Sequence, residues 1–314
     1  MHPFISFTLR RTAILIISLF HVGYFCQAQD SPANQLVLPE GRVPFTWMNY
    51  KDNPYSAMLI PVRLKGCPKV FYMQFDTGSP YSLLYRNKLK AIQKRYAQSV
   101  QVSDTTGKLQ QFRFNIGNIA ILAKEIAVQQ FDSVNVNWSK DAVEIIGTLG
   151  TDLIDNKVAF INYPEKYMLI TNHKKQEDTV AWSGFIYEHR RILLPFSIRG
   201  EKKIVYFDTG SSAFELLTDK ATAMLLASPD AIPGSQEVQS WGRLLKATSV
   251  QTADSIEIAS QKLPLRTVTY MEGVTDAQIN AMKKMGIGGM TGNRLFVNNI
   301  LVIDTRNKKF CVMR

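Results

Sequence analysis

The sequence predicts a mostly β protein made of two similar lobes. The tetrapeptide Asp-Thr-Gly-Ser occurs twice, beginning at Asp76 and at Asp208. Each copy directly follows a short apolar stretch that is typical of a buried strand, and helical patterns are few. At an average usage of about 5–7% per residue type, even one chance copy in a chain of this length is improbable. The two copies therefore indicate that one structural unit, used twice, delivers two carboxylates.

The N-terminal residues have the pattern of a signal peptide. Two arginines precede a short apolar stretch at residues 13–25, and Ala28 supplies a small residue at a cleavage position. The stretch is short for a membrane span. We therefore expect residues 1–28 to be removed during export to the periplasm or the medium, with no stable membrane association. An uncleaved anchor and a lipid-modified Cys26 are the alternatives, and bulky residues before Cys26 disfavour the second.

Four segments recur in the same order in the two halves of the chain. They are residues 61–66 and 195–200, the two Asp-Thr-Gly-Ser segments, residues 119–128 and 256–265, and residues 146–154 and 288–296. The spacing between partners drifts by a few residues, as expected where loops differ in length. The repeat predicts an N-terminal lobe over residues 29–172 and a C-terminal lobe over residues 173–314.

Within each lobe the residue pattern favours strands. An apolar stretch leads into each Asp, and residues 111–116 alternate apolar and polar side chains as a half-buried strand does. Residues 119–128 and 256–265 are expected to form pairs of short strands. Similar strands close the two lobes at residues 158–167 and 300–310.

Helices are expected at two places only. Residues 87–96 are one candidate, and residues 275–285 are a better one because Thr275 and Gln278 have capping-box spacing. Residues 172–179 are polar and lack large apolar side chains, so they are predicted to link the two lobes.

Charge and cysteine content narrow the class of function. The chain carries 37 Lys and Arg against 26 Asp and Glu, but its basic residues form no long run. This predicts a solvated basic surface and no nucleic-acid partner. Cys67 and Cys311 remain after signal cleavage; export permits a disulfide, and the sequence does not decide whether they pair. No cysteine or histidine spacing suits a metal, so we expect neither a metal nor another cofactor.

The two Asp-Thr-Gly-Ser units resemble those of the aspartic peptidases, pepsins and retropepsins. Downstream of each unit lies an apolar pair before glycine, Ile145-Ile146-Gly147 in the first half and, more weakly, Ile287-Gly288-Gly289 in the second. The match is to the single-chain form, and each lobe is similar to the short retropepsin-like unit of bacterial proteins. The resemblance covers nearly all of the chain after Asn53. It implies a bilobal acid-protease fold, with two similar β-barrel lobes related by a pseudo-twofold axis.

The resemblance implies that Asp76 and Asp208 form a catalytic pair that holds one water molecule. Two adjacent carboxyl groups cannot both ionise, so they share a proton. The ionised member takes a proton from the water while the other polarises or protonates the peptide carbonyl. No covalent enzyme intermediate is formed.

The residues next to each Asp are implied to support it. They are Thr77, Gly78 and Ser79 in the first half and Thr209, Gly210 and Ser211 in the second. The threonines are expected to hydrogen-bond across the axis, and the glycines to let backbone N–H groups approach the carboxylates. The serines are expected to donate to the outer carboxylate oxygens, which favours the ionised form. Ile146 and Gly147, and Gly289 in the second half, are expected to support the two loops from behind.

A flap over the cleft is expected from the resemblance, but the sequence departs from the usual patterns. Pepsins carry a Tyr on the flap and retropepsins a Gly-rich tip. Residues 102–112 contain no Tyr and only Gly107, while the second half offers Trp241 and Gly242. These three residues are the flap candidates.

The preferred interpretation is an exported aspartic endopeptidase that acts on polypeptides as a monomer, because one chain supplies both Asp residues. The alternative is a catalytically inactive pepsin-like pseudo-enzyme that binds extended peptides between the lobes. The presence of both Asp residues favours the enzyme. A serine hydrolase that uses Ser79 or Ser211 is disfavoured, since it needs a nucleophile elbow and a placed histidine.

Overall fold

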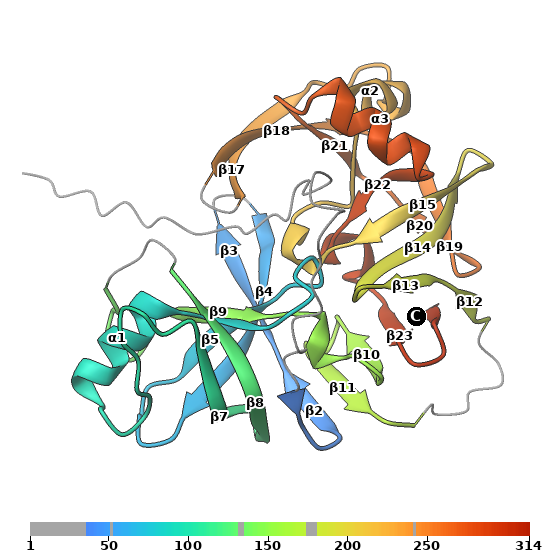
Figure 1. The fold of residues 1–314 in the computed structure, drawn as a ribbon. Helices are drawn as coiled ribbons and strands as arrows, with labels where there is room; N and C mark the ends of the chain where they lie inside the picture. Colours follow the sequence, from blue (N-terminus) through green and yellow to red (C-terminus); the bar gives the residue numbers. More distant parts are fainter. Residues whose placement is uncertain (1–35, 51–52, 131–134, 174–180, 241–242) are drawn as a thin grey trace, which may run out of the picture.

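The computed structural model describes residues 36–50, 53–130, 135–173, 181–240 and 243–314. Within these ranges the chain is mostly β and forms three sheets, of eight, six and ten strands (Figure 1). The predicted signal peptide lies outside the described residues. No helix in the described part of the chain has the length and apolar character that a membrane span requires.

The eight-stranded sheet belongs to the first half of the chain. Its strands are β1 (Leu36–Val37), β3 (Thr46–Tyr50), β4 (Asn53–Leu64), β5 (Phe71–Phe75), β6 (Leu83–Tyr85), β7 (Lys108–Ile116), β8 (Ile119–Gln129) and β9 (Ile145–Leu149). Along the sheet the order is β1-β8-β6-β9-β5-β4-β3, with β7 paired to β4 and β8. The helix α1 (Arg86–Arg95) follows β6 and lies at one side of this lobe (Figure 1).

The ten-stranded sheet belongs to the second half. Its strands are β13 (Ile186–Glu188), β14 (Arg191–Ile198), β15 (Glu201–Phe207), β16 (Leu216–Thr218), β17 (Gly234–Ser240), β18 (Arg243–Gln251), β19 (Ser255–Ile258), β20 (Gln261–Pro264), β21 (Thr267–Met271) and β22 (Ile287–Thr291). Helices α2 (Lys220–Leu226) and α3 (Asp276–Lys284) lie at the top of this lobe in Figure 1.

The six-stranded sheet contains strands from both halves. It consists of β2 (Gly41–Pro44), β10 (Val158–Asn162), β11 (Tyr167–Thr171), β12 (Ser183–Gly184), β23 (Ile300–Asp304) and β24 (Lys309–Met313). The strands that close the two halves are direct neighbours, because β10 pairs antiparallel with β23 and Phe160 lies opposite Val302. The predicted mostly β bilobal fold is therefore confirmed, and the halves are joined by backbone hydrogen bonds.

The structure revises one of the two predicted pairs of short strands and confirms the other. Residues 119–128 do not form two short strands but one long strand, β8, whereas residues 255–264 do form the hairpin β19–β20. The difference lies at Ala259 and Ser260, which take positive φ angles of 47° and 59° and close a tight turn. The first half has no such turn at this place, so its backbone stays extended.

Both predicted helices are present, as α1 and α3. The helix α2 was not predicted, because its seven residues give only a weak periodic signal. Asp219 caps it by accepting a hydrogen bond of 3.2 Å from the Thr222 backbone N–H. The predicted linker lies mostly outside the described residues.

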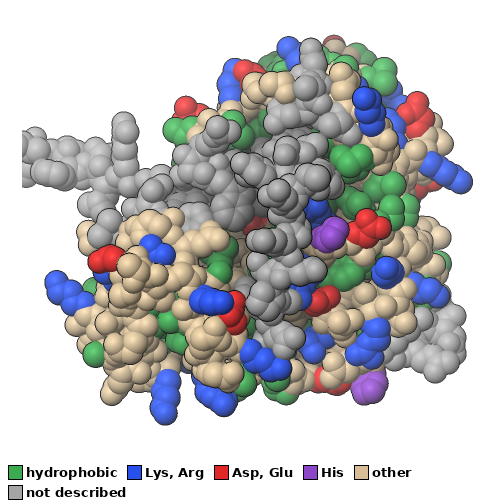
Figure 2. Space-filling model, in the orientation of Figure 1, with side chains coloured by type: hydrophobic (Ala, Val, Ile, Leu, Met, Phe, Trp, Pro, Cys, Tyr) green, Lys and Arg blue, Asp and Glu red, His purple; other side chains and the backbone are tan. Residues whose placement is uncertain are grey.

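Among the described residues, Cys67 and Cys311 are both buried and are not joined by a disulfide. Burial raises the pKa of the Cys67 thiol. On the visible face of the molecule, Lys and Arg side chains are spread out with Asp and Glu among them (Figure 2).

Candidate active site

The two Asp residues are held at the ends of equivalent strands. β5 ends at Phe75 and β15 at Phe207, and each lies parallel to a strand from later in its half, β9 or β22. The Asp76 N–H donates to the Leu149 carbonyl and the Asp208 N–H to the Thr291 carbonyl, both at 2.9 Å. The chain therefore leaves each sheet at the Asp with its backbone direction fixed.

Glycines in β9 and β22 let a third strand pass close by. A Cβ atom on Gly147 would lie 2.3 Å from the Leu83 carbonyl oxygen, and one on Gly289 would lie 2.4 Å from the Leu217 carbonyl oxygen. Both contacts are with backbone, so no side chain fits at either position. Ile146, beside Gly147, is fully buried. These residues lie behind the Asp loops, where the sequence predicted supports.

The two threonines cross-link the loops with a symmetric set of hydrogen bonds. The Thr77 N–H donates to Thr209 Oγ1 at 2.9 Å, and the Thr209 N–H donates to Thr77 Oγ1 at 3.0 Å. Each hydroxyl in turn donates to a carbonyl of the opposite half: Thr77 to Phe207 and Thr209 to Phe75, both at 2.8 Å. Four buried hydrogen bonds therefore fix one loop against the other.

The same loops bring the two carboxyl groups together. Backbone N–H groups of Gly78 and Gly210 donate to Oδ1 of Asp76 and Asp208, each at 2.8 Å. A Cβ atom on Gly210 would lie 2.5 Å from Oδ1 of Asp76, so this glycine also makes room for the opposite carboxyl. Both Asp residues are fully buried.

The carboxyl groups have raised pKa values, and they are not equivalent. Burial raises the pKa of Asp76 well above its usual value, and the charge of Asp208 and a hydrogen bond between the two carboxyls raise it further. Burial also raises the pKa of Asp208, but hydrogen bonds from Asp76 and Ser211 oppose the rise. Of the two carboxyl groups, Asp208 therefore has the surroundings that stabilise its ionised form better.

The serines account for part of this difference. Ser211 Oγ donates to Oδ2 of Asp208 at 3.0 Å, as predicted. Ser79 does not donate to Asp76; its hydroxyl donates to the Tyr81 carbonyl at 2.7 Å. No described N–H or hydroxyl group donates to Oδ2 of Asp76. The cause is Pro80, because a residue before proline is disfavoured in helical conformation, whereas Ser211 lies in a short 3₁₀ turn.

Two supporting residues behind the loops were not predicted. Thr151 Oγ1 donates to the Thr77 carbonyl at 3.0 Å, and Asn293 Nδ2 donates to the Thr209 carbonyl at 3.1 Å. Each follows a glycine, Gly150 or Gly292, on which a Cβ atom would collide with the neighbouring Asp loop. The sequence contained one signal for these supports. Residues 146–154 and 288–296 share a second glycine, Gly150 or Gly292, as their fifth residue.

Tyr206 also contacts the loop of the opposite half, close to Asp76 and Asp208, which are called the dyad below. This contact was not predicted. Tyr206 precedes Asp208 by two residues, and its hydroxyl lies 3.4 Å from the Thr77 carbonyl and 3.3 Å from the Gly78 carbonyl. Burial raises its pKa, and the charges of Asp208 and Asp76 raise it further. The phenol therefore stays protonated as a donor to the opposite loop.

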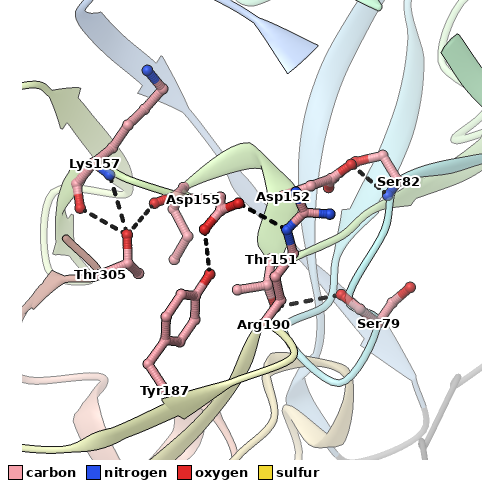
Figure 3. A network of polar contacts seen from close by, with 10 residues as sticks. Ser79, Ser82, Thr151, Asp152, Asp155, Lys157, Tyr187, Arg190 and Thr305 are labelled. Carbon is pink, nitrogen blue, oxygen red and sulfur yellow. Dashed lines mark hydrogen bonds and ion pairs between the residues drawn. The ribbon is translucent and has the colours of Figure 1, made fainter. Parts of the chain in front are cut away.

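A second polar network joins the halves behind Thr151 (Figure 3). The backbone N–H and hydroxyl of Ser82 donate to Asp152 at 2.9 and 2.7 Å. Burial raises the pKa of Asp152 to about 6. Beside it, Tyr187 and Arg190 from the second half both donate to Asp155 of the first half at 2.9 Å. Hydrogen bonds thus connect the halves at a second place.

The predicted flap residues are only partly described. Gly107 lies directly before β7, and its carbonyl accepts a hydrogen bond from Val128; residues 102–107 contain a turn and no strand. Trp241 and Gly242 lie outside the described residues. The strands β17 and β18 on either side of them form a regular antiparallel hairpin. Val238 of this hairpin packs with Met290 in an apolar cluster of the second half.

A pocket of about 450 Å³ lies in the second half, between α3 and the ten-stranded sheet. Leu217, Met271, Met282 and Met290 are among its apolar lining residues. Ser211 Oγ, which donates to Asp208, lies 3.6 Å from the sulfur of Met290. Met290 of the pocket lining and Ser211 therefore connect the pocket with Asp208. In the described part of the chain no three His, Cys, Asp or Glu side chains cluster so as to hold a metal.

Comparison with known proteins agrees with this architecture. No protein-family model matches the sequence, and neither does any curated protein. Among solved structures, the chain is similar to an aspartic proteinase from Irpex lacteus, with a TM-score of 0.52 and 15% sequence identity. The match covers 88% of this chain and 97% of that one. The fold is pepsin-like. At this identity the likeness establishes the fold alone, so catalytic competence must be argued from the site.

Proposed function

We propose that the chain is an aspartic endopeptidase, a single-chain form with two retropepsin-like lobes that is exported after cleavage near Ala28. The observation that carries the proposal is that Asp76 and Asp208 are both fully buried on two loops that Thr77 and Thr209 hydrogen-bond together, with Gly210 leaving room for the Asp76 carboxyl. Sharing one proton gives the pair an acid and a base at the same time, as peptide hydrolysis by a bound water requires.

The inequality of the two carboxyls assigns their roles. Asp208 accepts hydrogen bonds from Gly210 and Ser211, which stabilise its anion, so it is the base that takes a proton from the attacking water. Asp76 carries the proton and donates it to the carbonyl oxygen of the scissile peptide. The result is a neutral tetrahedral diol with no bond to the enzyme. Because the carboxyls are coupled, a measured pH profile reports the pair as a unit.

The test is cleavage of a mixed peptide library by the native protein and by Asp76→Asn and Asp208→Asn. An amide cannot transfer the proton, so each substitution is expected to reduce turnover by at least about 10³-fold. Asp230→Asn, at an exposed position, is the matched control and should retain full activity. Undiminished turnover in either dyad variant would refute the proposal.

The pseudo-enzyme remains the second candidate because part of the expected flap is missing, as residues 102–107 form no hairpin. Peptide binding without cleavage by the native protein would favour it. Export is tested separately by N-terminal sequencing of protein from the native host, which is expected to begin near Gln29.

A further inference from the structure

The side-chain amide of Gln74 is buried and makes no hydrogen bond. It lies on β5 two residues before Asp76, and because alternate residues of a strand share a face, the two side chains point to the same side of the sheet. Gln74 is 0% exposed, and neither its Oε1 nor its Nε2 has a hydrogen-bond partner. Burying an amide without partners is unfavourable, so this residue requires an explanation beyond packing.

The corresponding residue of the second half, Tyr206, is satisfied. Its hydroxyl has two carbonyl acceptors in the opposite loop, at 3.4 and 3.3 Å. Its ring packs against an apolar cluster that includes Leu217, Met271 and Met290. Tyr206 therefore offers an apolar ring and a hydroxyl that is already hydrogen-bonded.

The wall of the first half is different. In the sheet, Gln74 lies beside Thr148 of β9. Thr148 Oγ1 is 3.0 Å from the Tyr85 hydroxyl, so these two groups satisfy each other without Gln74. The pKa of Tyr85 is raised by burial and also by the charge of Asp76, which indicates that the phenol lies within electrostatic reach of the dyad. Gln74 is thus the unbonded member of a polar strip beside Asp76.

We propose that Gln74 determines specificity: its amide binds an amide or hydroxyl side chain of the substrate residue that lies next to the scissile bond on the side of the first half. This rests on the proposed peptidase function. An amide offers both donors and an acceptor, so Asn, Gln, Ser and Thr side chains are its natural partners. Gln74 and Asp76 are both fully buried and lie two residues apart, so we expect a movement that admits a peptide to Asp76 to expose Gln74 as well.

The experiment compares cleavage sites in a defined random-peptide library for the native protein, Gln74→Leu and a matched control. The control is Gln251→Leu, the same chemical change at an exposed position of β18. The native protein and the control are expected to prefer Asn, Gln, Ser or Thr at one of the two positions that flank the cut. Gln74→Leu is expected to lose at least about tenfold of that preference in kcat/KM, in favour of apolar residues.

Thermal unfolding separates this role from a purely structural one. Gln74→Leu removes an unbonded buried amide, so its melting temperature is expected to equal or exceed that of the native protein. Gln74→Met, which keeps the side chain unbranched, is the second variant if Leu does not fold. Unchanged selectivity in an active Gln74→Leu or Gln74→Met protein would overturn the proposal, as would a lower melting temperature with the native preference retained.

Failure of the peptidase function is distinguishable from failure of this inference. Two peptides that differ only by Gln or Leu at one central position are titrated into the native protein by calorimetry. If the native protein cuts nothing but binds the Gln peptide more tightly, and Gln74→Leu abolishes the difference, the recognition role stands and the peptidase assignment falls. Equal binding of the peptides by the native protein, with no polar preference in cleavage, overturns the role of Gln74.

Discussion

At the scale of single residues, the two halves of the site are similar but unequal. The same Asp-Thr-Gly-Ser sequence produces a hydroxyl donor to Asp208 and none to Asp76, because Pro80 redirects Ser79 to the Tyr81 carbonyl. A hydrogen bond to an anion favours that anion. The unequal hydrogen-bond donors thus favour the ionised form of Asp208 over that of Asp76.

Ser211→Ala removes the donor to Asp208 and is expected to raise the pKa at which Asp208 ionises. Activity requires ionised Asp208, so the acidic limb of the kcat/KM profile should move to higher pH by about one unit. Ser79→Ala should leave the profile in place, since its hydroxyl bonds only the Tyr81 carbonyl. Equal shifts in the two variants would contradict the assigned asymmetry.

Asp152 gives a prediction about stability. Burial raises its pKa to about 6, against a usual value of 3.8, so the folded state binds the proton more tightly than the unfolded state does. Its contribution to stability is therefore complete below about pH 4 and is lost as the pH rises through about 6. The loss amounts to about 3 kcal/mol.

Urea unfolding of the native protein and of Asp152→Asn at several pH values measures this contribution. The stability difference between the two proteins should change between pH 4 and 6, while the dyad contributes equally to both and cancels. A difference that does not depend on pH would show that folding does not raise the pKa of Asp152.

At the scale of elements, the supports behind the dyad depend on three strands passing within backbone contact. Gly147→Ala would bring a Cβ atom to 2.3 Å from the Leu83 carbonyl oxygen, which the backbone cannot relieve without moving β6 or β9. We expect it to cost about 3 kcal/mol or more of unfolding free energy. Gly107→Ala, which meets nothing within 4 Å, should be nearly neutral. Comparable losses in the two variants would argue against the close crossing.

Some features of the strands could be predicted from the sequence and others could not. Strands that run into Asp76 and Asp208 were predictable because their apolar residues, turn and glycine recur together. The predicted pair of short strands was right for β19 and β20 and wrong for the unbroken strand β8, because the break depends on positive φ angles at Ala259 and Ser260 that residue type does not reveal. Gln74 and Tyr206 were missed for a different reason. Each occupies an ordinary strand position, and the hydrogen bonds that its side chain makes or lacks are visible only in the folded structure.

At the scale of the whole molecule, the halves are joined at several places, three of which are extensive enough to matter for unfolding. They share the six-stranded sheet, the threonine cross-link between the Asp loops, and the contacts of Tyr187 and Arg190 with Asp155. Such joining predicts that the halves unfold together. Calorimetry should give one transition whose calorimetric and van't Hoff enthalpies agree. Two resolved transitions would mean that the halves are independent.

The central claim is that two coupled carboxyls, one protonated and one ionised, hydrolyse peptide bonds. The pH dependence of kcat/KM on a single cleaved peptide tests it most directly, because the profile reports both members of the pair in the free enzyme. We expect a bell-shaped profile with its maximum on the acidic side of neutral. Its acidic limb should mark ionisation of Asp208 and its basic limb loss of the shared proton. A profile that stays flat across this range, or that rises steadily into alkaline pH, would contradict the account.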